Sequence, residues 1–180
     1  MALPATIHNI DVDLSDTDRG VYETLSLRVA RHPSESEAHL AARVLAYCLE
    51  FTEGIAFSRG VSDPDEPAIA VRDLTGVLTA WIDIGTPDAA RLHRASKAAG
   101  RVAAYVHKDP VQYLRQLTGE RIHRGEALEL FALDRALVEG FVARLARRMS
   151  CSLSVTDREL YLSIGDETVS GPVSRLHLTS

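Results

Sequence analysis

The sequence predicts a single α/β or α+β domain built around a central mixed sheet. Three observations lead to this class: strand-like alternation at both ends of the chain, a strand–helix–strand unit in its middle, and an ordinary globular composition. The chain has 180 residues, of which 46% are hydrophobic and 25% are charged. A chain of this size and composition can bury a core without disulfides. We therefore expect one domain over residues 1–180, with a hairpin at each end of the sheet.

The overall charge and the cysteine content limit the possible binding partners and the cellular compartment of the protein. The net charge is −5, so contact with nucleic acid would require a local basic patch. Cys48 and Cys151 lie far apart in apolar contexts, which favours a reducing compartment over a disulfide framework. The sequence shows no membrane-spanning run and no signal-peptide pattern, so we expect a cytoplasmic protein that does not contact membranes.

The N-terminal segment predicts a β-hairpin with one wet face. Polar and apolar residues alternate along residues 4–31, and the turn at Ser15–Gly20 is rich in Asp, Ser and Gly. The dipeptide at His32 and Pro33 ends the second strand.

A helix and two short strands are expected next. Ser34 to Glu37 has the S-x-x-E form of a capping box, and apolar residues then recur at helical spacing until Gly54. Short strands are expected at 55–57 and 69–71. The proline-rich, acidic stretch 62–67 between them predicts a loop.

The stretch from Asp73 to His107 predicts the centre of the fold. Val77–Ile84 is a mostly apolar strand, and Thr86 and Pro87 suit the start of a helix. We expect that helix to end near Gly100 and a second strand to follow at Arg101–His107. Two strands joined by a helix in this way pair in parallel, with a right-handed crossover.

The C-terminal third predicts a helix followed by a second hairpin. Asp134 can cap a helix that runs to about Met149, because apolar residues repeat every four positions there. Residues 151–164 alternate as a hairpin, and the tail after Gly171-Pro172 is expected to be loose. Two elements precede this region: a short helix at Pro110–Leu117 and a strand at Leu128–Leu133.

Asp83 is the strongest candidate for a functional residue. It lies near the end of a strand expected to be buried on both faces. A carboxylate there is costly unless it is paired or binds a metal, and ligands of such sheets collect at the carboxyl ends of strands. The structural alternative is that Asp83 only caps the turn or the next helix.

Asp65 and Glu66 lie in the proline-rich loop and could complete a site with Asp83. Magnesium is held by one or two carboxylates together with substrate phosphate and water. Such an ion could activate water for phosphodiester hydrolysis. The alternative is that the acidic loop is only solvated.

Cations and one further acid complete the candidate set. Arg91, Arg94 and Lys97 recur every three residues on the central helix, as either phosphate contacts or an ordinary wet face. Glu35 precedes the first helix, where it favours the positive end of the helix dipole. The seven histidines show no zinc-ligand spacing.

Several separate motifs are spread over nearly the whole chain. They are ARHPSE at 30–35, SRG-SDPDEP at 58–67, DLTG at 73–76 and WIDIGTPD at 81–88. Together they resemble the YaeQ family of bacterial proteins, and the opening MALPATI and the C-terminal hairpin agree with that family as well.

The family's fold is similar to that of the PD-(D/E)XK nucleases. This implies a restriction-endonuclease-like core of helix, three strands, helix and strand over roughly residues 34–133, followed by a helix and hairpin at 134–172. Carried over, Asp83 matches the (D/E) position, Asp65 or Glu66 is the other metal-binding acid, and Glu35 resembles the accessory acid.

The resemblance departs from the nuclease pattern at the catalytic lysine. Gly85 stands where the lysine belongs, and the chain contains only Lys97 and Lys108. Either the cation has moved to the helix, at Lys97 or Arg94, or it is missing.

Two hypotheses follow. The first is a magnesium-dependent nuclease, in which Asp83 and one of Asp65 or Glu66 bind the metal and Arg94 or Lys97 contacts the scissile phosphate. The second is a nucleic-acid-binding or regulatory module that uses a degenerate nuclease scaffold without cleavage.

Overall fold

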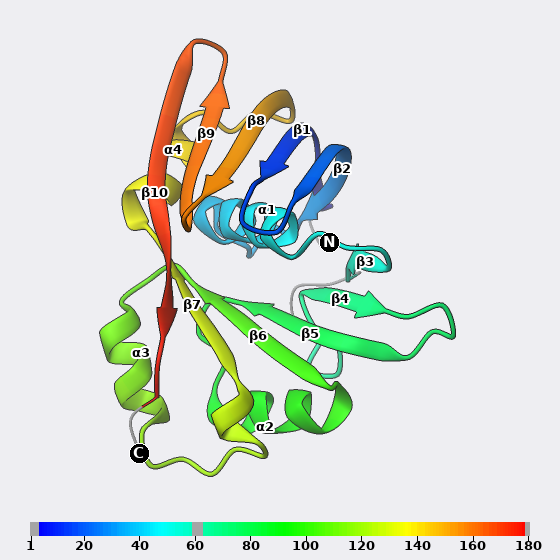
Figure 1. The fold of residues 1–180 in the computed structure, drawn as a ribbon, viewed down its shortest axis with the longest axis vertical. Coiled ribbons are helices and arrows are strands. Elements are labelled where there is room, and N and C mark those ends of the chain that lie inside the picture. The colour runs from blue at the N-terminus through cyan, green and yellow to red at the C-terminus, as the bar shows by residue number, and fades with distance from the viewer. Residues whose placement is uncertain (1–3, 59–62, 179–180) are drawn as a thin grey trace. The chain divides into compact units, whose positions relative to one another are not determined.

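The computed structural model describes residues 4–58 and 63–178, and shows a mixed α+β fold (Figure 1). The chain divides into two compact units. Unit 1 comprises Met1–Val44 with Leu133–Ser174, and unit 2 comprises Leu45–Ala132 with Arg175–Ser180. The expected loop residue Ser62, and parts of two motifs quoted above, lie outside the described residues.

Unit 1 is built on the N-terminal hairpin, which is confirmed. Strands β1 (Thr6–Asp16) and β2 (Val21–Arg31) pair antiparallel along their whole length. The alternation arises because one face is buried, through Ile10, Val12 and Leu14 on β1. The face is completed by Leu25, Leu27 and Val29 on β2.

The C-terminal part of unit 1 differs from the expectation. Helix α4 (Arg135–Ala143) is capped by Asp134 as predicted, but it ends well before Met149. Met149 instead belongs to β8 (Arg148–Thr156), which pairs in parallel with β1. The four-residue repeat was misleading because ladder pairing with β1 overrides local helical spacing.

The expected hairpin is a three-stranded meander. Strand β8 pairs with β9 (Glu159–Ile164), and β9 pairs with β10 (Glu167–Leu176). The prediction of a loose tail is wrong, because Gly171 and Pro172 lie within β10 and the Pro172 carbonyl accepts the Asp134 N–H at 3.1 Å. The strand order in this unit is β2-β1-β8-β9-β10.

Unit 2 contains the predicted strand–helix–strand centre. Strand β5 (Leu78–Ile84), helix α2 (Ala89–Ala98) and strand β6 (Arg101–Val106) follow one another, and β5 and β6 pair in parallel. The other strands are β3 (Ile55–Phe57), β4 (Ile69–Arg72) and β7 (Glu129–Leu133), in the order β7-β6-β5-β4-β3. Strands β3, β4 and β5 form an antiparallel meander, and β6 and β7 are parallel.

One face of unit 2's strands is covered by α2 and by α3 (Pro110–Leu117). The core between them includes Trp81 on β5, Leu92 on α2 and Tyr113 on α3. The Tyr113 hydroxyl donates to the Pro87 carbonyl at 2.6 Å, which fixes the approach to α2.

The helix ends were predicted less well than the helices themselves. Helix α1 spans Glu37–Glu50, and its cap is Ser36, whose hydroxyl accepts the His39 N–H at 3.0 Å, rather than Ser34. Helix α2 is capped by Asp88, not Thr86, because the Asp88 carboxylate accepts the Arg91 N–H. At its other end Ala99, in an extended conformation, replaces the expected glycine cap.

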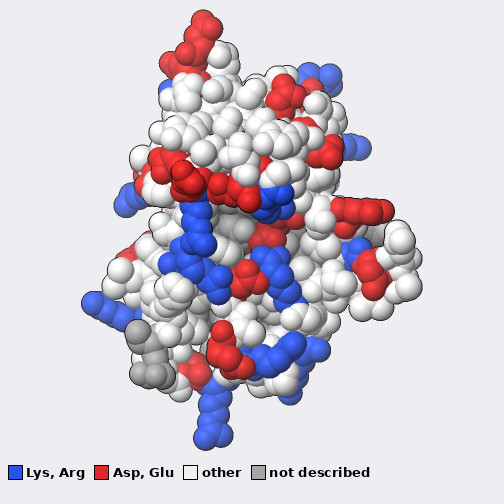
Figure 2. Space-filling view, in the orientation of Figure 1, with Lys and Arg blue, Asp and Glu red and all other residues white. Residues whose placement is uncertain are grey.

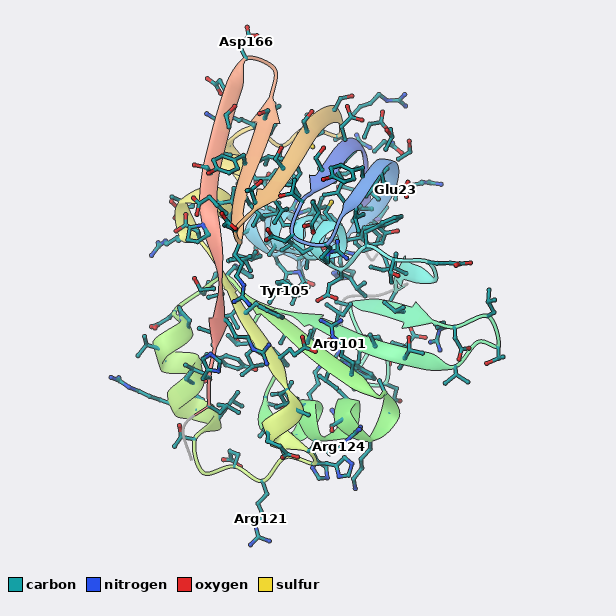
Figure 3. All side chains as sticks on the ribbon, in the orientation of Figure 1. Glu23, Arg101, Tyr105, Arg121, Arg124 and Asp166 are labelled. Carbon is teal, nitrogen blue, oxygen red and sulfur yellow. The ribbon has the colours of Figure 1, made fainter. Side chains whose placement is uncertain are left out.

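The carboxyl end of α2 is held by Arg124, which lies just before the short 3₁₀ helix η1 (Gly125–Ala127). The Arg124 guanidinium donates to the carbonyls of Ser96 and Ala99, and the Ala99 contact measures 2.9 Å. A cation at the carboxyl end of a helix satisfies exposed carbonyls and complements the helix dipole. Figure 3 labels Arg124 and also Arg121, which points away from the ribbon.

We expect Arg124→Ala to lower the free energy of unfolding by about 1 kcal/mol, because two carbonyls of α2 lose their donor. Urea denaturation of both proteins measures this difference. Arg121→Ala is the matched control and should change the value by less than about 0.5 kcal/mol. Equal destabilisation by both substitutions would contradict a capping role for Arg124.

Candidate functional site

Asp83 lies near the end of β5, as the sequence predicts, and its side chain shares a face with Trp81. That face is covered by α2, and Asp83 is only 2% exposed. Its backbone is in register with Ala104 of the parallel neighbour β6. The carboxylate is therefore enclosed and needs compensation within the protein.

The compensation comes from Arg91 on the first turns of α2. The Arg91 Nε donates to Asp83 Oδ2 at 2.7 Å, and one terminal nitrogen donates to Oδ1 at 3.0 Å. This is the two-pronged geometry in which guanidinium and carboxylate bind most strongly. Hydrogen bonding to Asp83 raises the pKa of Arg91 above its ordinary value. Both carboxylate oxygens of Asp83 are thus engaged by a cation that the chain itself supplies.

Arg91 also forms hydrogen bonds with the acidic loop and so connects this loop to the end of β5. Its terminal nitrogens donate to the carbonyls of Asp63 at 3.2 Å and Glu66 at 2.7 Å, and the Ala68 N–H lies 3.4 Å from Asp83 Oδ1. The guanidinium carbon lies 5.2 Å from the centre of the Trp81 ring, within range of a cation–π interaction. One arginine therefore connects helix, strand and loop.

The other predicted residues of this region are arranged differently. Asp65 is exposed, and Glu66 contributes its carbonyl rather than its carboxylate to the contact with Arg91. Arg94 and Lys97 are exposed on α2. Within residues 4–58 and 63–178, no group of three or more His, Cys, Asp or Glu side chains has the arrangement of a metal site. The structure thus joins Asp83 to Arg91 and to the loop backbone.

Glu35 belongs to unit 1 and has its own partners there. It is 5% exposed, accepts from Arg43 at 3.0 and 2.9 Å, and lies 2.5 Å from His39 Nδ1. Burial alone would raise the pKa of Glu35, but the His39 hydrogen bond and the Arg43 charge outweigh it and hold the pKa below its ordinary value. Its role at the start of α1 is a buried ion pair rather than a simple dipole contact.

A second charged cluster in unit 2 was missed at the level of sequence. Arg101 on β6 donates to both oxygens of Glu50, at 2.6 and 2.9 Å, and to both oxygens of Glu129, at 2.6 and 3.2 Å. The Tyr105 hydroxyl donates to Glu50 at 2.6 Å. Arg101 and Tyr105 both come from β6 (Figure 3).

This cluster lies on the face of β6 opposite the Asp83 core, because Arg101 and Tyr105 alternate with the buried Val102 and Ala104. Burial alone would lower the pKa of Arg101, but hydrogen bonds to Glu50 and Glu129 raise it above its ordinary value. The signal in the sequence was an arginine opening an otherwise apolar strand. The partners of Arg101 come from α1 and β7, which are distant in sequence, so no local sequence pattern predicts them.

The geometry defines an α+β protein with a neutralised acid at the end of its central strand, and sequence comparison gives the family. The chain belongs to the YaeQ family, because the family model described as "YaeQ protein" matches residues 1–172. In the described part of the chain, no helix has the length and apolarity that crossing a membrane requires.

Curated relatives and solved structures agree with this assignment. "Uncharacterized protein YaeQ" of Escherichia coli K12 is 30% identical over 164 residues, and that of Salmonella typhi is 31% identical over 168. Each of these matches covers 91% of both chains.

The crystal structure of YaeQ from Pseudomonas syringae has a TM-score of 0.87 at 27% identity, covering 98% of both chains. The structure of YaeQ from Xanthomonas axonopodis pv. citri has a TM-score of 0.86 at 29% identity, covering 95% of this chain and 97% of the other.

Proposed function

We propose that this chain is a non-catalytic binding module on a nuclease-like scaffold. The observation that carries the proposal is the two-pronged ion pair between Asp83 and Arg91, which engages both oxygens of the acid that would have to hold a metal. The position expected to carry the catalytic lysine is Gly85. The strand-end acid thus has a structural partner, and the cation that would act on a phosphate is absent from its strand.

The fit of magnesium to these residues is poor. A magnesium ion takes one or two carboxylates in near-octahedral geometry, and it would have to displace Arg91 from an enclosed carboxylate. Removing one partner from such a pair is costly. Arg91 also holds the loop of Asp65 and Glu66 through backbone carbonyls. We therefore derive no metal-dependent step for this site.

The nuclease hypothesis retains one supporting observation. The order α1, β3, β4, β5, α2, β6, with an antiparallel meander followed by a parallel strand, agrees with the core that the resemblance implies. Magnesium-dependent cleavage of DNA or RNA therefore stays the second candidate. The nucleic-acid contact that it requires would rest on local cations, since basic and acidic side chains are intermixed on the face drawn in Figure 2.

The test compares the wild type with Asp83→Asn on a panel of single- and double-stranded DNA and RNA. Each reaction contains about 5–10 mM Mg²⁺ or Mn²⁺. We expect no cleavage above the protein-free control with either protein. Calorimetric titration with Mg²⁺ is expected to give no saturable heat. Metal-dependent cleavage that disappears in Asp83→Asn would overturn the binding-module proposal and establish the nuclease.

A further inference from the structure

A hollow on unit 1 is lined by three arginines for which the described residues provide no ion pair. It has a volume of about 560 Å³ and is lined by Ile7, Asn9, Arg28, Arg147 and Arg148. We call it the arginine cleft. Its lining comes from β1, from β2, from the first residue of β8 and from Arg147, which immediately precedes β8, all within unit 1.

The register of the strands places the cleft residues in one row. Asn9 of β1 is opposite Arg28 of β2 on one side and opposite Arg148 of β8 on the other. Residues in register across neighbouring strands point to the same face of a sheet. All three are exposed. With strands about 4.8 Å apart, the two arginines of the row start about 10 Å from each other, with the Asn9 amide between them.

These arginines have no partners among residues 4–58 and 63–178. The structure gives no ion pair and no side-chain hydrogen bond to Arg28, Arg147 or Arg148, whereas Arg43, Arg91 and Arg101 each hold a carboxylate. Three like charges around one hollow repel one another. A bound anion would remove that repulsion and would accept hydrogen bonds from the guanidinium groups and from the Asn9 amide.

The surroundings limit the size of that anion. Two residues further along β1, on the same face, Asp11 lies opposite Ser26 and Ser150, and Asp13 follows it. A long polyanion running along the strands would meet these carboxylates. The positive region is therefore confined to one corner of the sheet, and this favours a compact ligand.

We propose that the arginine cleft binds a compact ligand that carries two linked phosphoryl groups. One guanidinium group can donate two parallel hydrogen bonds to two oxygens of a phosphoryl group. A single phosphate carries about −1.5 to −2 charges, which leaves part of three positive charges unmatched, whereas two linked phosphoryl groups balance them. The Asn9 amide would donate between the two groups. This proposal goes beyond the binding-module proposal and does not depend on it, because the cleft and Asp83 lie in different units.

The test is calorimetric titration of the full chain with inorganic pyrophosphate, with orthophosphate and sulfate as single-group comparisons. We expect saturable pyrophosphate binding that is tighter than binding of either comparison anion and that weakens as NaCl is raised. Arg28→Gln and Arg148→Gln should each weaken pyrophosphate binding at least about tenfold. Arg135→Gln is the matched control, since this exposed unit 1 arginine pairs with Glu139 and does not line the cleft, and it should leave binding unchanged.

Circular dichroism and thermal unfolding establish that each variant is folded before titration. Absence of saturable pyrophosphate binding at millimolar concentration overturns the proposal, as does equal binding by Arg28→Gln, Arg148→Gln and wild type. A single-stranded DNA or RNA oligonucleotide that binds more tightly than pyrophosphate, with the same dependence on Arg28 and Arg148, would assign the cleft to a nucleic-acid backbone and overturn the compact ligand. Metal-dependent cleavage would bear only on Asp83 and would leave the cleft result unaffected.

Discussion

Replacing Asp83 with alanine is expected to lower the free energy of unfolding by about 3 kcal/mol. The substitution leaves Arg91 without its carboxylate, and breaking a buried ion pair by removing one partner typically costs about 3–5 kcal/mol. We place the effect at the lower end because the Arg91 side chain is 23% exposed and can regain water. Chemical denaturation monitored by Trp81 fluorescence measures it directly, since that ring lies beneath Arg91.

Asp65→Ala separates this structural role from a metal-binding role. Asp65 is exposed in the same loop, so its replacement should change stability by less than about 0.5 kcal/mol. A metal site built from both acids would instead predict that either substitution abolishes a metal-dependent stabilisation. Such stabilisation of the wild type by Mg²⁺, lost in both variants, would contradict our assignment of Asp83 to Arg91 alone.

Replacing Arg43 with methionine is expected to cost about 3–5 kcal/mol of unfolding free energy, because it leaves Glu35 in the interior without its main cation. The two side chains are 5% and 1% exposed, so water cannot substitute for the lost partner. Arg43 also donates to the Ala30 carbonyl at 2.9 Å, and that carbonyl loses a partner too. Thermal and urea unfolding at pH 7 measure the loss.

The double variant Glu35→Gln/Arg43→Met provides the control. Because it removes both charges, it should be less destabilised than the sum of the two single variants by about 1–3 kcal/mol. Additive effects would show that the two side chains do not stabilise each other.

The same pair predicts a pH dependence. Since folding holds the pKa of Glu35 below its ordinary value, its stabilising contribution is complete above the unfolded pKa and is lost as the pH falls through the folded pKa. In Arg43→Met the cause of the lowering is weakened, so acidification should cost the variant less stability than it costs the wild type. Unfolding measured from about pH 7 down to about pH 3 would show the stability gap between the two proteins narrowing as the pH falls through the range in which glutamate side chains are protonated. A constant gap would contradict this reading.

Local patterns sufficed for much of the fold. The alternation of β1 and β2 and the apolar strands on either side of α2 depend on neighbours in the sequence, so the hairpin and the parallel pair could be predicted. The β8 ladder could not, because Met149 is set by its pairing with Ile10, far away in the chain. Repeats of three or four residues cannot reveal a partner strand of this kind.

The sequence predicted the key residue of the candidate site but not its partner. The cost of burying a carboxylate drew attention to Asp83, and the structure shows it buried. Its partner could not be chosen by spacing alone, since Arg91, Arg94 and Lys97 share one periodic stripe. In the structure it is Arg91 that contacts Asp83, while Arg94 and Lys97 are exposed. The metal-binding roles of Asp65, Glu66 and Glu35 stay predictions.

The pairing of β1 with β8 has a consequence for synthesis on the ribosome. Residues 9–16 bind residues 148–155, so the N-terminal hairpin emerges long before the strand that covers its edge. The intervening segment Leu45–Ala132 forms unit 2 almost entirely by itself, and its strands are all available earlier. An exposed strand edge is a template for unwanted association, and closing such a distant contact is slow. One edge of the hairpin in the nascent chain therefore stays unpaired until β8 has left the exit tunnel.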